Sequence, residues 1–262
     1  MGLPPDKEFL SGQLQLEGKA VVVTGGRQGI GEAIAVAAAQ AGADVLVTTR
    51  EEGAAAETVS RIADLGARAL GVTADVRSRA DCERVVRSAV DEFGRLDVLV
   101  NNAGVSAAGA ALEYGEDDWD RVFDTNLKGS FLMSQAAART MSAQSGGRII
   151  NLSSTYARRP YARMAAYASA KAGLEQLTRV LALEWAPLGV TVNALALTSV
   201  LTETRAHLYA DPDRLARRLA EIPLGRLAEV SDAVGAFLYL AGPAAAFVTG
   251  HTLLVDGGFT LT

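Results

Sequence analysis

Short apolar runs alternate with longer amphipathic segments along most of the chain, beginning near residue 18. The runs "AVVVTG" (20–25), "DVLVTT" (44–49) and "LDVLVNNAG" (96–104) are rich in β-branched residues and show no in–out alternation. Continuous apolar strands of this kind are typical of a parallel sheet covered on both faces. Further strands are expected within 67–76, 147–154, 189–196 and 252–257, which makes about seven.

Helical periodicity fills the intervals between these strands. Helices are expected over 31–42, 52–66, 79–94, 119–141, 164–185 and 230–241, with a polar helical segment near 199–220. Strand and helix alternate with short connections and no low-complexity linker. This order predicts a single doubly wound (Rossmann) α/β domain over residues 18–262, preceded by a weakly structured tail at 1–17.

Composition and charge exclude several classes of function. The net charge is −5 with acidic and basic residues interspersed, so neither a nucleic acid nor an anionic membrane is an expected partner. One cysteine and two histidines give no disulfide framework and no expected metal site. The first residues lack the apolar run of a signal peptide, and no stretch is long and apolar enough to span a bilayer. A soluble cytoplasmic protein is therefore expected.

A glycine-rich loop, "TGGRQGIG" (24–31), joins the first strand to the first helix. Backbone N–H groups at a helix N-terminus attract phosphate, and glycines allow close approach to the backbone. A tight turn in a glycine-rich chain is the alternative, but the strand–turn–helix context favours dinucleotide binding. The expected cofactor contacts here are Gly25, Arg27, Gln28, Gly29, Ile30 and Gly31.

The second strand indicates which dinucleotide is bound. It ends "TTR" with no carboxylate to accept from a ribose 2′-hydroxyl, and Arg50 follows, with Arg27 in the glycine loop. Guanidinium groups match phosphate geometry, so NADP(H) is favoured while NAD(H) stays possible. Alternatively both arginines are ordinary surface charges, and the neighbouring Glu51 lowers the positive potential around them. Asp75, after the third strand, could accept from the adenine amino group or could cap a helix.

Candidate chemistry lies in "YASAK", where Tyr167 and Lys171 share one face of a helix. A tyrosine pKa of about 10 is too high for a base near neutrality. A neighbouring ammonium and a positive nicotinamide ring favour the phenolate, and lowering the pKa by about three units corresponds to roughly 4 kcal/mol. Ser154 ends the preceding strand, where its hydroxyl could polarise a carbonyl.

Together these motifs resemble the classical short-chain dehydrogenase/reductase family over about residues 18–260. The family pattern T-G-x-x-x-G-x-G matches Thr24–Gly31, and N-N-A-G matches Asn101–Gly104. The family's helical asparagine and its serine match Asn126 and Ser154, and Y-x-x-x-K matches Tyr167–Lys171. The five matches occur in the family's order along the chain.

The resemblance implies a role for each matching residue. Tyr167 is the general acid/base, Lys171 lowers its pKa and binds the nicotinamide ribose, Ser154 orients the substrate oxygen, and Asn126 holds a water of the proton relay. The remaining cofactor contacts are expected at Asp75, Val76, Asn102, Ala103, Gly104 and Thr202. A substrate lid is implied near 198–220.

One departure from the family pattern concerns the turn beside the nicotinamide. Leu197 and Thr198 stand where the family usually carries Pro-Gly, which predicts a different and more mobile turn. The assignment of Thr202 depends on that turn.

The loop 155–164 should flank the substrate pocket, with Tyr156 and Tyr161 as walls beside Ser154 and Tyr167. Its arginines could bind a carboxylate or phosphate, although a solvated basic loop is the favoured interpretation.

The resemblance implies an NADP(H)-dependent carbonyl reductase or alcohol dehydrogenase acting on a small or medium secondary alcohol or ketone, possibly a polyol or keto sugar. A 3-oxoacyl-carrier-protein reductase is the alternative enzyme, and a catalytically silent NADP(H) sensor is the alternative from another class. A homotetramer or homodimer is implied, paired through helices near 116–141 and 165–186.

Overall fold

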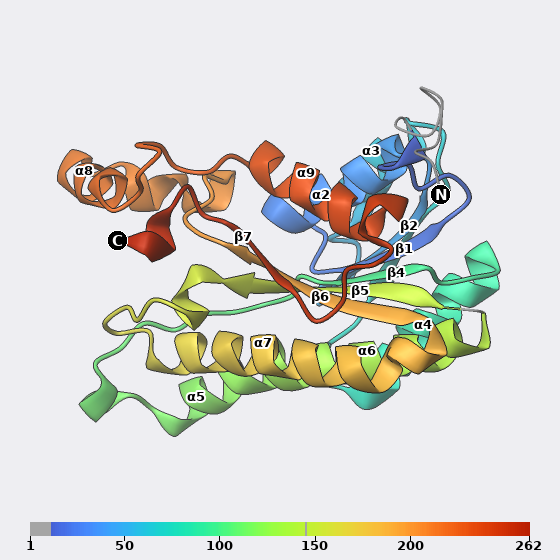
Figure 1. The fold of residues 1–262 in the computed structure, drawn as a ribbon, viewed down its shortest axis with the longest axis horizontal. Helices are drawn as coiled ribbons and strands as arrows, with labels where there is room; N and C mark the ends of the chain where they lie inside the picture. The colour runs from blue at the N-terminus through green and yellow to red at the C-terminus, as the bar shows by residue number, and fades with distance from the viewer. Residues whose placement is uncertain (1–11, 145) are drawn as a thin grey trace, which may run out of the picture.

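The computed structural model describes residues 12–144 and 146–262, and its centre is a seven-stranded parallel sheet (Figure 1). The strands are β1 Ala20–Thr24, β2 Asp44–Thr49, β3 Ala69–Thr73, β4 Val98–Asn101, β5 Gly147–Ser154, β6 Val190–Leu197 and β7 Thr252–Val255. Their order across the sheet is β3-β2-β1-β4-β5-β6-β7. The predicted doubly wound α/β fold is confirmed, and the reversal of strand order between β1 and β4 creates the crevice where such sheets bind ligands.

Helices cover both faces of the sheet (Figure 1). One layer holds α2 Gly29–Gln40, α3 Ala56–Ala63 and α9 Val230–Ala241, and the other holds α4 Arg79–Phe93, α5 Glu116–Phe123, α6 Gly129–Ala143 and α7 Ala165–Trp185. The helix α8 Pro212–Ala220 lies apart from both layers, near the C-terminus. No helix among residues 12–144 and 146–262 has the length and apolar character needed to cross a membrane.

A hydrophobic core forms on each face of the sheet because successive side chains of each strand point to opposite faces. Val21 and Val23 of β1 belong to the core beneath α2 and α9, whereas Ala20 and Val22 belong to the core beneath α4 and α6. All four are at most 1 % exposed. A fully buried valine contributes about 1.5–3 kcal/mol, so both faces of the same strand stabilise the sheet.

The last residues of the predicted N-terminal tail pack against the domain. Residues 1–11 lie outside the described residues, but Leu16 is 1 % exposed and belongs to the core beneath α2 and α9. Its N–H donates to the carbonyl of Ala41 at 2.7 Å. The prediction of weak structure is therefore wrong for this end of the segment 1–17, because the apolar side chain of Leu16 completes a core that the local pattern does not reveal.

The predicted helix over 119–141 is interrupted in its middle. A π-helical turn over Asp124–Lys128 connects α5 to α6. Such a turn inserts one extra residue into the helical ladder and is frequent at functional sites. It changes which side chains face the sheet, and it contains Asn126.

Candidate active site

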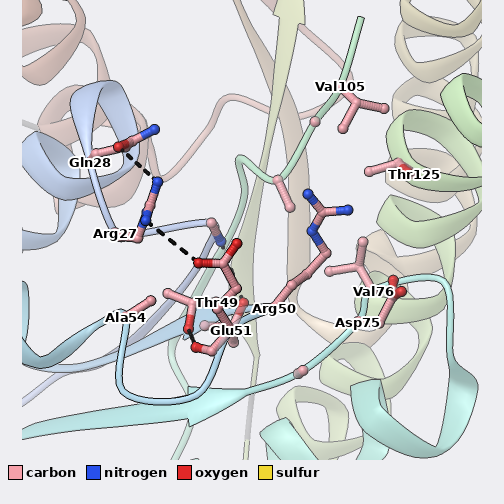
Figure 2. A pocket seen from close by; sticks show the side chains of 15 residues that line it. Arg27, Gln28, Thr49, Arg50, Glu51, Ala54, Asp75, Val76, Val105 and Thr125 are labelled. Carbon is pink, nitrogen blue, oxygen red and sulfur yellow. Dashed lines mark hydrogen bonds and ion pairs between the residues drawn. The ribbon is translucent and has the colours of Figure 1, made fainter. Parts of the chain in front are cut away.

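A cavity of about 230 Å³ opens at the carboxyl ends of β1, β2, β3 and β4 (Figure 2). Eight of the predicted cofactor residues line it: Gly25, Arg27, Gln28, Arg50, Asp75, Val76, Ala103 and Gly104. The order of the strands brings these residues together, since parallel strands all end at the same edge of the sheet.

The glycine loop shapes one wall of this cavity. Gly25 and Gly29 have φ values of 67° and 63°, a region that residues with a side chain rarely adopt. Ile30 and Gly31 lie in the first turn of α2, and a Cβ on Gly31 would collide with the side chain of Asn102. A side chain at this position would therefore prevent the close contact between the glycine loop and Asn102.

The N-terminus of α2 adjoins this loop. Gln28 occupies the N-cap position of α2 and makes no capping hydrogen bond with its side chain. The first N–H groups of the helix therefore lack a side-chain cap, which suits an anion at the helix N-terminus. Loop and helix together fit the pyrophosphate of a dinucleotide.

Asn102 fixes the glycine loop against β4. Its amide nitrogen donates to the carbonyls of Thr24 and Gly25, both at 2.9 Å. The hydroxyl of Thr24 accepts in return from the backbone N–H groups of Asn102 and Ala103 at 3.0 Å. These bonds explain why the T-G and N-N-A-G patterns occur together, because each holds the other in place.

Two arginines stand at the outer end of the cavity (Figure 2). Arg27 lies 3.7 Å from a carboxylate oxygen of Glu51, and both side chains are largely exposed. Arg50 extends across the cavity toward Val105 and Thr125. Among the described residues Arg50 forms no hydrogen bond or ion pair. The absence of a carboxylate at the tip of β2 and the presence of two guanidinium groups favour a 2′-phosphate.

Asp75 lines the cavity but does not cap a helix. Its carboxylate accepts from the guanidinium Nε of Arg77 at 2.9 Å, and Arg77 holds the pKa of this carboxyl below its ordinary value although partial burial opposes the shift. Ser78 is the N-cap of α4 and accepts from the N–H of Asp81. The helix-cap interpretation of Asp75 is therefore wrong, and its place in the cavity agrees with the adenine side.

The predicted reacting residues lie at the end of β5, which carries Ser154, and in the first turns of α7, which carries Tyr167 and Lys171. Lys171 is 4 % exposed, and its ammonium donates to the carbonyl of Leu152 at 2.6 Å. The same nitrogen lies 5.7 Å from the ring centroid of Tyr167. The oxygen of Ser154 accepts from the N–H of Tyr156 at 3.2 Å, and the Tyr156 ring stands edge-on to Tyr167 with centroids 6.4 Å apart. Leu152 and Tyr156 thus connect the end of β5 to Lys171 and Tyr167 of α7, although none of the predicted reacting residues lines the cavity described above.

Asn126 lies in the π-helical turn and borders the same region. Its amide nitrogen donates to the carbonyls of Val105 and Val122 at 2.7 and 2.8 Å. Its side-chain oxygen is buried and has no hydrogen-bond partner among the described residues. A Cβ on Gly104 would lie only 2.7 Å from that oxygen. A buried acceptor without a donor suits a water or ligand group, which agrees with the predicted proton relay.

The turn after β6, for which the sequence predicts mobility, is buried and paired with a distant segment. Thr198 and Ser199 are buried, and the segment pairs with Ala228: the N–H of Ala228 donates to Ser199 at 3.1 Å and that of Leu201 donates to Ala228 at 2.7 Å. Backbone pairing with a distant residue supplies partners that the local sequence does not show. Thr202 lies over the glycine loop, since a Cβ on Gly29 would be 3.5 Å from its methyl group.

The residues predicted to form the wall of the substrate pocket are aromatic and lie together. Tyr156 and Tyr161 stack with centroids 4.7 Å apart and planes 9° from parallel. Two arginines of this loop have structural partners rather than solvent alone: Arg158 pairs with buried Glu175, and Arg159 lies over the ring of Phe259. Arg158 is nevertheless 40% exposed, so the interpretation of a solvated loop still applies to it in part, whereas Arg159 is half-buried.

Several further residues line the cavity but were not among the predicted cofactor contacts: Thr48, Thr49, Glu51, Ala54, Ala74, Val105 and Thr125. Most of them end or follow a strand at the carboxyl edge of the sheet, which is the signal that could have found them. Among the described residues no group of three or more histidine, cysteine, aspartate or glutamate side chains could hold a metal ion.

The chain is similar to known enzymes over nearly its whole length. Residues 25–260 match a family model described as enoyl-(acyl carrier protein) reductase. The chain is 42% identical over 245 residues to 2-dehydro-3-deoxy-D-gluconate 5-dehydrogenase of Escherichia coli, covering 93% of this chain and 96% of that protein. It is 40% identical to a 3-oxoacyl-[acyl-carrier-protein] reductase of Vibrio cholerae, covering 94% and 98%.

A solved structure shares both the fold and the sequence likeness. Gluconate 5-dehydrogenase of Burkholderia cenocepacia, in complex with NADP and tartrate, superposes with a TM-score of 0.92 at 33% identity, covering 96% of this chain and 98% of that one. The chain therefore belongs to the short-chain dehydrogenase/reductase family of NAD(P)-dependent oxidoreductases.

Proposed function

We propose that the protein is an NADP(H)-dependent dehydrogenase that interconverts a secondary alcohol and a ketone in a polyol, keto sugar or sugar acid. The observation that carries the proposal is the position of Ser154 at the end of β5, beside the helix α7 that carries Tyr167 and the buried Lys171, whose ammonium donates to Leu152 of β5. A protein that only senses the cofactor has no need of this arrangement.

The cofactor preference rests on the outer end of the crevice. Arg27 and Arg50 would contact the 2′-phosphate, while the N-terminus of α2 would hold the pyrophosphate. Three of the solved relatives carry NADP in their crystals. NAD(H) would bind more weakly, because it offers no charge to either guanidinium. When bound, the nicotinamide supplies or accepts the hydride.

The protein's own side chains would handle the substrate oxygen and its proton. Ser154 would hold that oxygen by a hydrogen bond, and the hydroxyl of Tyr167 would give or take the proton. The ammonium of Lys171 would favour the phenolate of Tyr167 and bind the nicotinamide ribose. Asn126 would connect the site to solvent through a water at its buried oxygen.

The substrate class is supported by the relatives. Proteins named as gluconate or 2-dehydro-3-deoxy-D-gluconate dehydrogenases are up to 42% identical to this chain in the comparisons above. A polyhydroxylated substrate of this size suits a site with several hydroxyl groups, from Ser154, Tyr156 and Tyr167. A 3-oxoacyl thioester is the second candidate substrate, because a reductase of that class is 40% identical.

A substrate panel tests the proposal. Nicotinamide absorbance would be followed with NADPH and with NADH against keto sugars, keto sugar acids, simple ketones and 3-oxoacyl thioesters. Turnover that prefers NADPH and a keto sugar or keto sugar acid is the expected result. A preference for the thioester would select the second candidate, and cofactor binding without turnover of any carbonyl would contradict the enzyme proposal.

We further propose that the protein is a cytoplasmic homotetramer or homodimer. Leu183 on α7 is 80 % exposed, and Phe247, just before β7, is fully exposed. Large exposed apolar side chains of this kind suit an interface between copies of the chain. A monomeric mass by light scattering at micromolar concentration would reject this assembly.

A further inference from the structure

A buried arginine on the lid adjoins the reacting residues. Arg218 lies on α8 and is 8 % exposed, whereas Arg214 and Arg217 of the same helix are exposed. Its guanidinium carbon lies 5.0 Å from the ring centroid of Tyr161 and 5.1 Å from that of Phe259. Aromatic rings thus replace water around this cation, which makes its electrostatic interactions stronger than at the surface.

The charge of Arg218 is incompletely satisfied within the chain. Its Nη1 lies 2.9 Å from a carboxylate oxygen of Glu221, whose side chain is 35% exposed. This nitrogen is nevertheless buried and donates no hydrogen bond to any described residue. A buried guanidinium with an unused donor is costly unless an anion completes its partners. Glu221, near the surface and beyond the end of α8, is a replaceable counter-ion.

Tyr156 joins this cation to the reacting residues. Its hydroxyl accepts from Nη2 of Arg218 at 2.8 Å, which leaves its own O–H free to donate. Burial raises the pKa of Tyr156, although Arg218 opposes the shift, so the hydroxyl keeps its proton near neutral pH. The backbone N–H of the same residue donates to Ser154, and its ring stands edge-on to Tyr167.

We infer that Arg218 and Tyr156 bind the carboxylate of an anionic substrate, which takes the place of Glu221 on the guanidinium. The substrate is then a hydroxy or oxo acid: its reacting carbon lies at Ser154 and Tyr167, and its carboxylate lies under α8. This assignment rests on the proposed function and makes Arg218 a specificity-determining residue. Arg158 and Arg159 are less suited to the role, because Glu175 and Phe259 already engage them.

The alternative is that Arg218 only fastens the lid helix to the aromatic rings. The two roles differ in their dependence on substrate charge. A fastener supports every substrate equally, whereas a carboxylate site discriminates an acid from a neutral compound of the same shape. D-Gluconate and D-glucitol form such a pair, since they differ in a carboxylate against a hydroxymethyl group.

The test measures binding of both compounds by calorimetry to NADP⁺-loaded Tyr167→Phe protein, in which turnover is blocked. We expect D-gluconate to bind at least about tenfold more tightly than D-glucitol. Adding Arg218→Gln should weaken D-gluconate binding about 10- to 100-fold and leave D-glucitol binding unchanged. Adding Glu221→Gln should tighten D-gluconate binding a few-fold, because the competing carboxylate is gone. Arg217→Gln, an exposed position on the same helix, is the matched control and should change neither.

Equal weakening of both compounds by Arg218→Gln would overturn the inference and leave a lid fastener. Equal binding of both compounds by the Tyr167→Phe protein would also overturn it. If Arg218→Gln does not fold, Glu221→Gln decides, and unchanged D-gluconate binding then counts against the inference. NADPH turnover by the wild-type protein on an uncharged keto sugar separates these results from a failure of the proposed function, because that activity does not require the carboxylate site.

Discussion

Glu175 offers a direct test of how the fold holds the catalytic serine. Its side chain on α7 is 6% exposed and accepts two hydrogen bonds, from the hydroxyl of Ser153 at 3.1 Å and from Arg158 at 3.0 Å. Ser153 is the strand neighbour of Ser154, and Arg158 ends the turn that carries Tyr156. A single carboxylate thus ties the end of β5 and the following turn to the helix that carries Tyr167 and Lys171.

Replacement by alanine removes both bonds and leaves the hydroxyl of Ser153 buried without its acceptor. A hydrogen bond to a charged group is worth about 1.5–3 kcal/mol, and the Arg158 bond counts for less because its side chain is 40% exposed. We expect Glu175→Ala to lower the free energy of unfolding by about 3 kcal/mol, and Glu175→Gln, which keeps an acceptor for Ser153, by about 1 kcal/mol.

The assay is thermal unfolding together with steady-state turnover. For a chain of this size Tm should fall by about 6–10 °C in Glu175→Ala and about 2–4 °C in Glu175→Gln. The kcat of the alanine variant should fall about tenfold, because Ser154 loses its support. A Glu175→Ala protein that melts within about 1 °C of wild type would refute the reasoning.

Three further predictions concern the cofactor end, the relay and the cysteine. The double variant Arg50→Gln with Arg27→Gln should raise the NADPH dissociation constant about 10- to 100-fold and change the NADH dissociation constant less than about threefold. Fluorescence titration measures both constants, and an equal loss of affinity for both cofactors would contradict the 2′-phosphate assignment. Gly104→Ala would place a methyl group 2.7 Å from the side-chain oxygen of Asn126, so kcat measured at saturating NADPH should fall about tenfold or more; unchanged kcat would exclude Asn126 from the relay. Burial raises the pKa of Cys82 to about 12, so its thiol should resist a thiol reagent at pH 8 and react only on unfolding; fast labelling of the native protein would contradict this. Folding favours the neutral thiol of Cys82, because the folded protein buries it. The thiol's contribution to the free energy of unfolding is therefore fully present below the unfolded-state pKa of 9.0 and is lost as the pH rises toward the folded-state value of about 12.

The sequence predicted those parts of the site that repeat at fixed local spacings. Strands and helices followed from apolar runs and periodicity, and Tyr167 and Lys171 followed from their separation by one helical turn. The glycine loop could be placed because it lies between a predicted strand and a predicted helix. These features depend on neighbours within a few residues, and such neighbours are visible in the sequence itself.

The remaining features depend on contacts between distant segments. Ala228 pairs with the turn after β6, and Arg218 inserts among rings from the loop 155–164 and the C-terminal segment. The π-helical turn at Asp124–Lys128 shares its residue types with an ordinary helix. Tertiary packing decides each of these, so neither charge pattern nor helix propensity could reveal them.

The account rests centrally on proton transfer by Tyr167, and the most direct test is Tyr167→Phe in a single-turnover measurement with pre-bound NADPH. We predict that the variant binds NADPH with a dissociation constant within about threefold of wild type, while hydride transfer to a keto substrate slows by at least about 100-fold. NADPH oxidation by the phenylalanine variant at the wild-type rate would contradict the assignment of Tyr167 and the mechanism built on it.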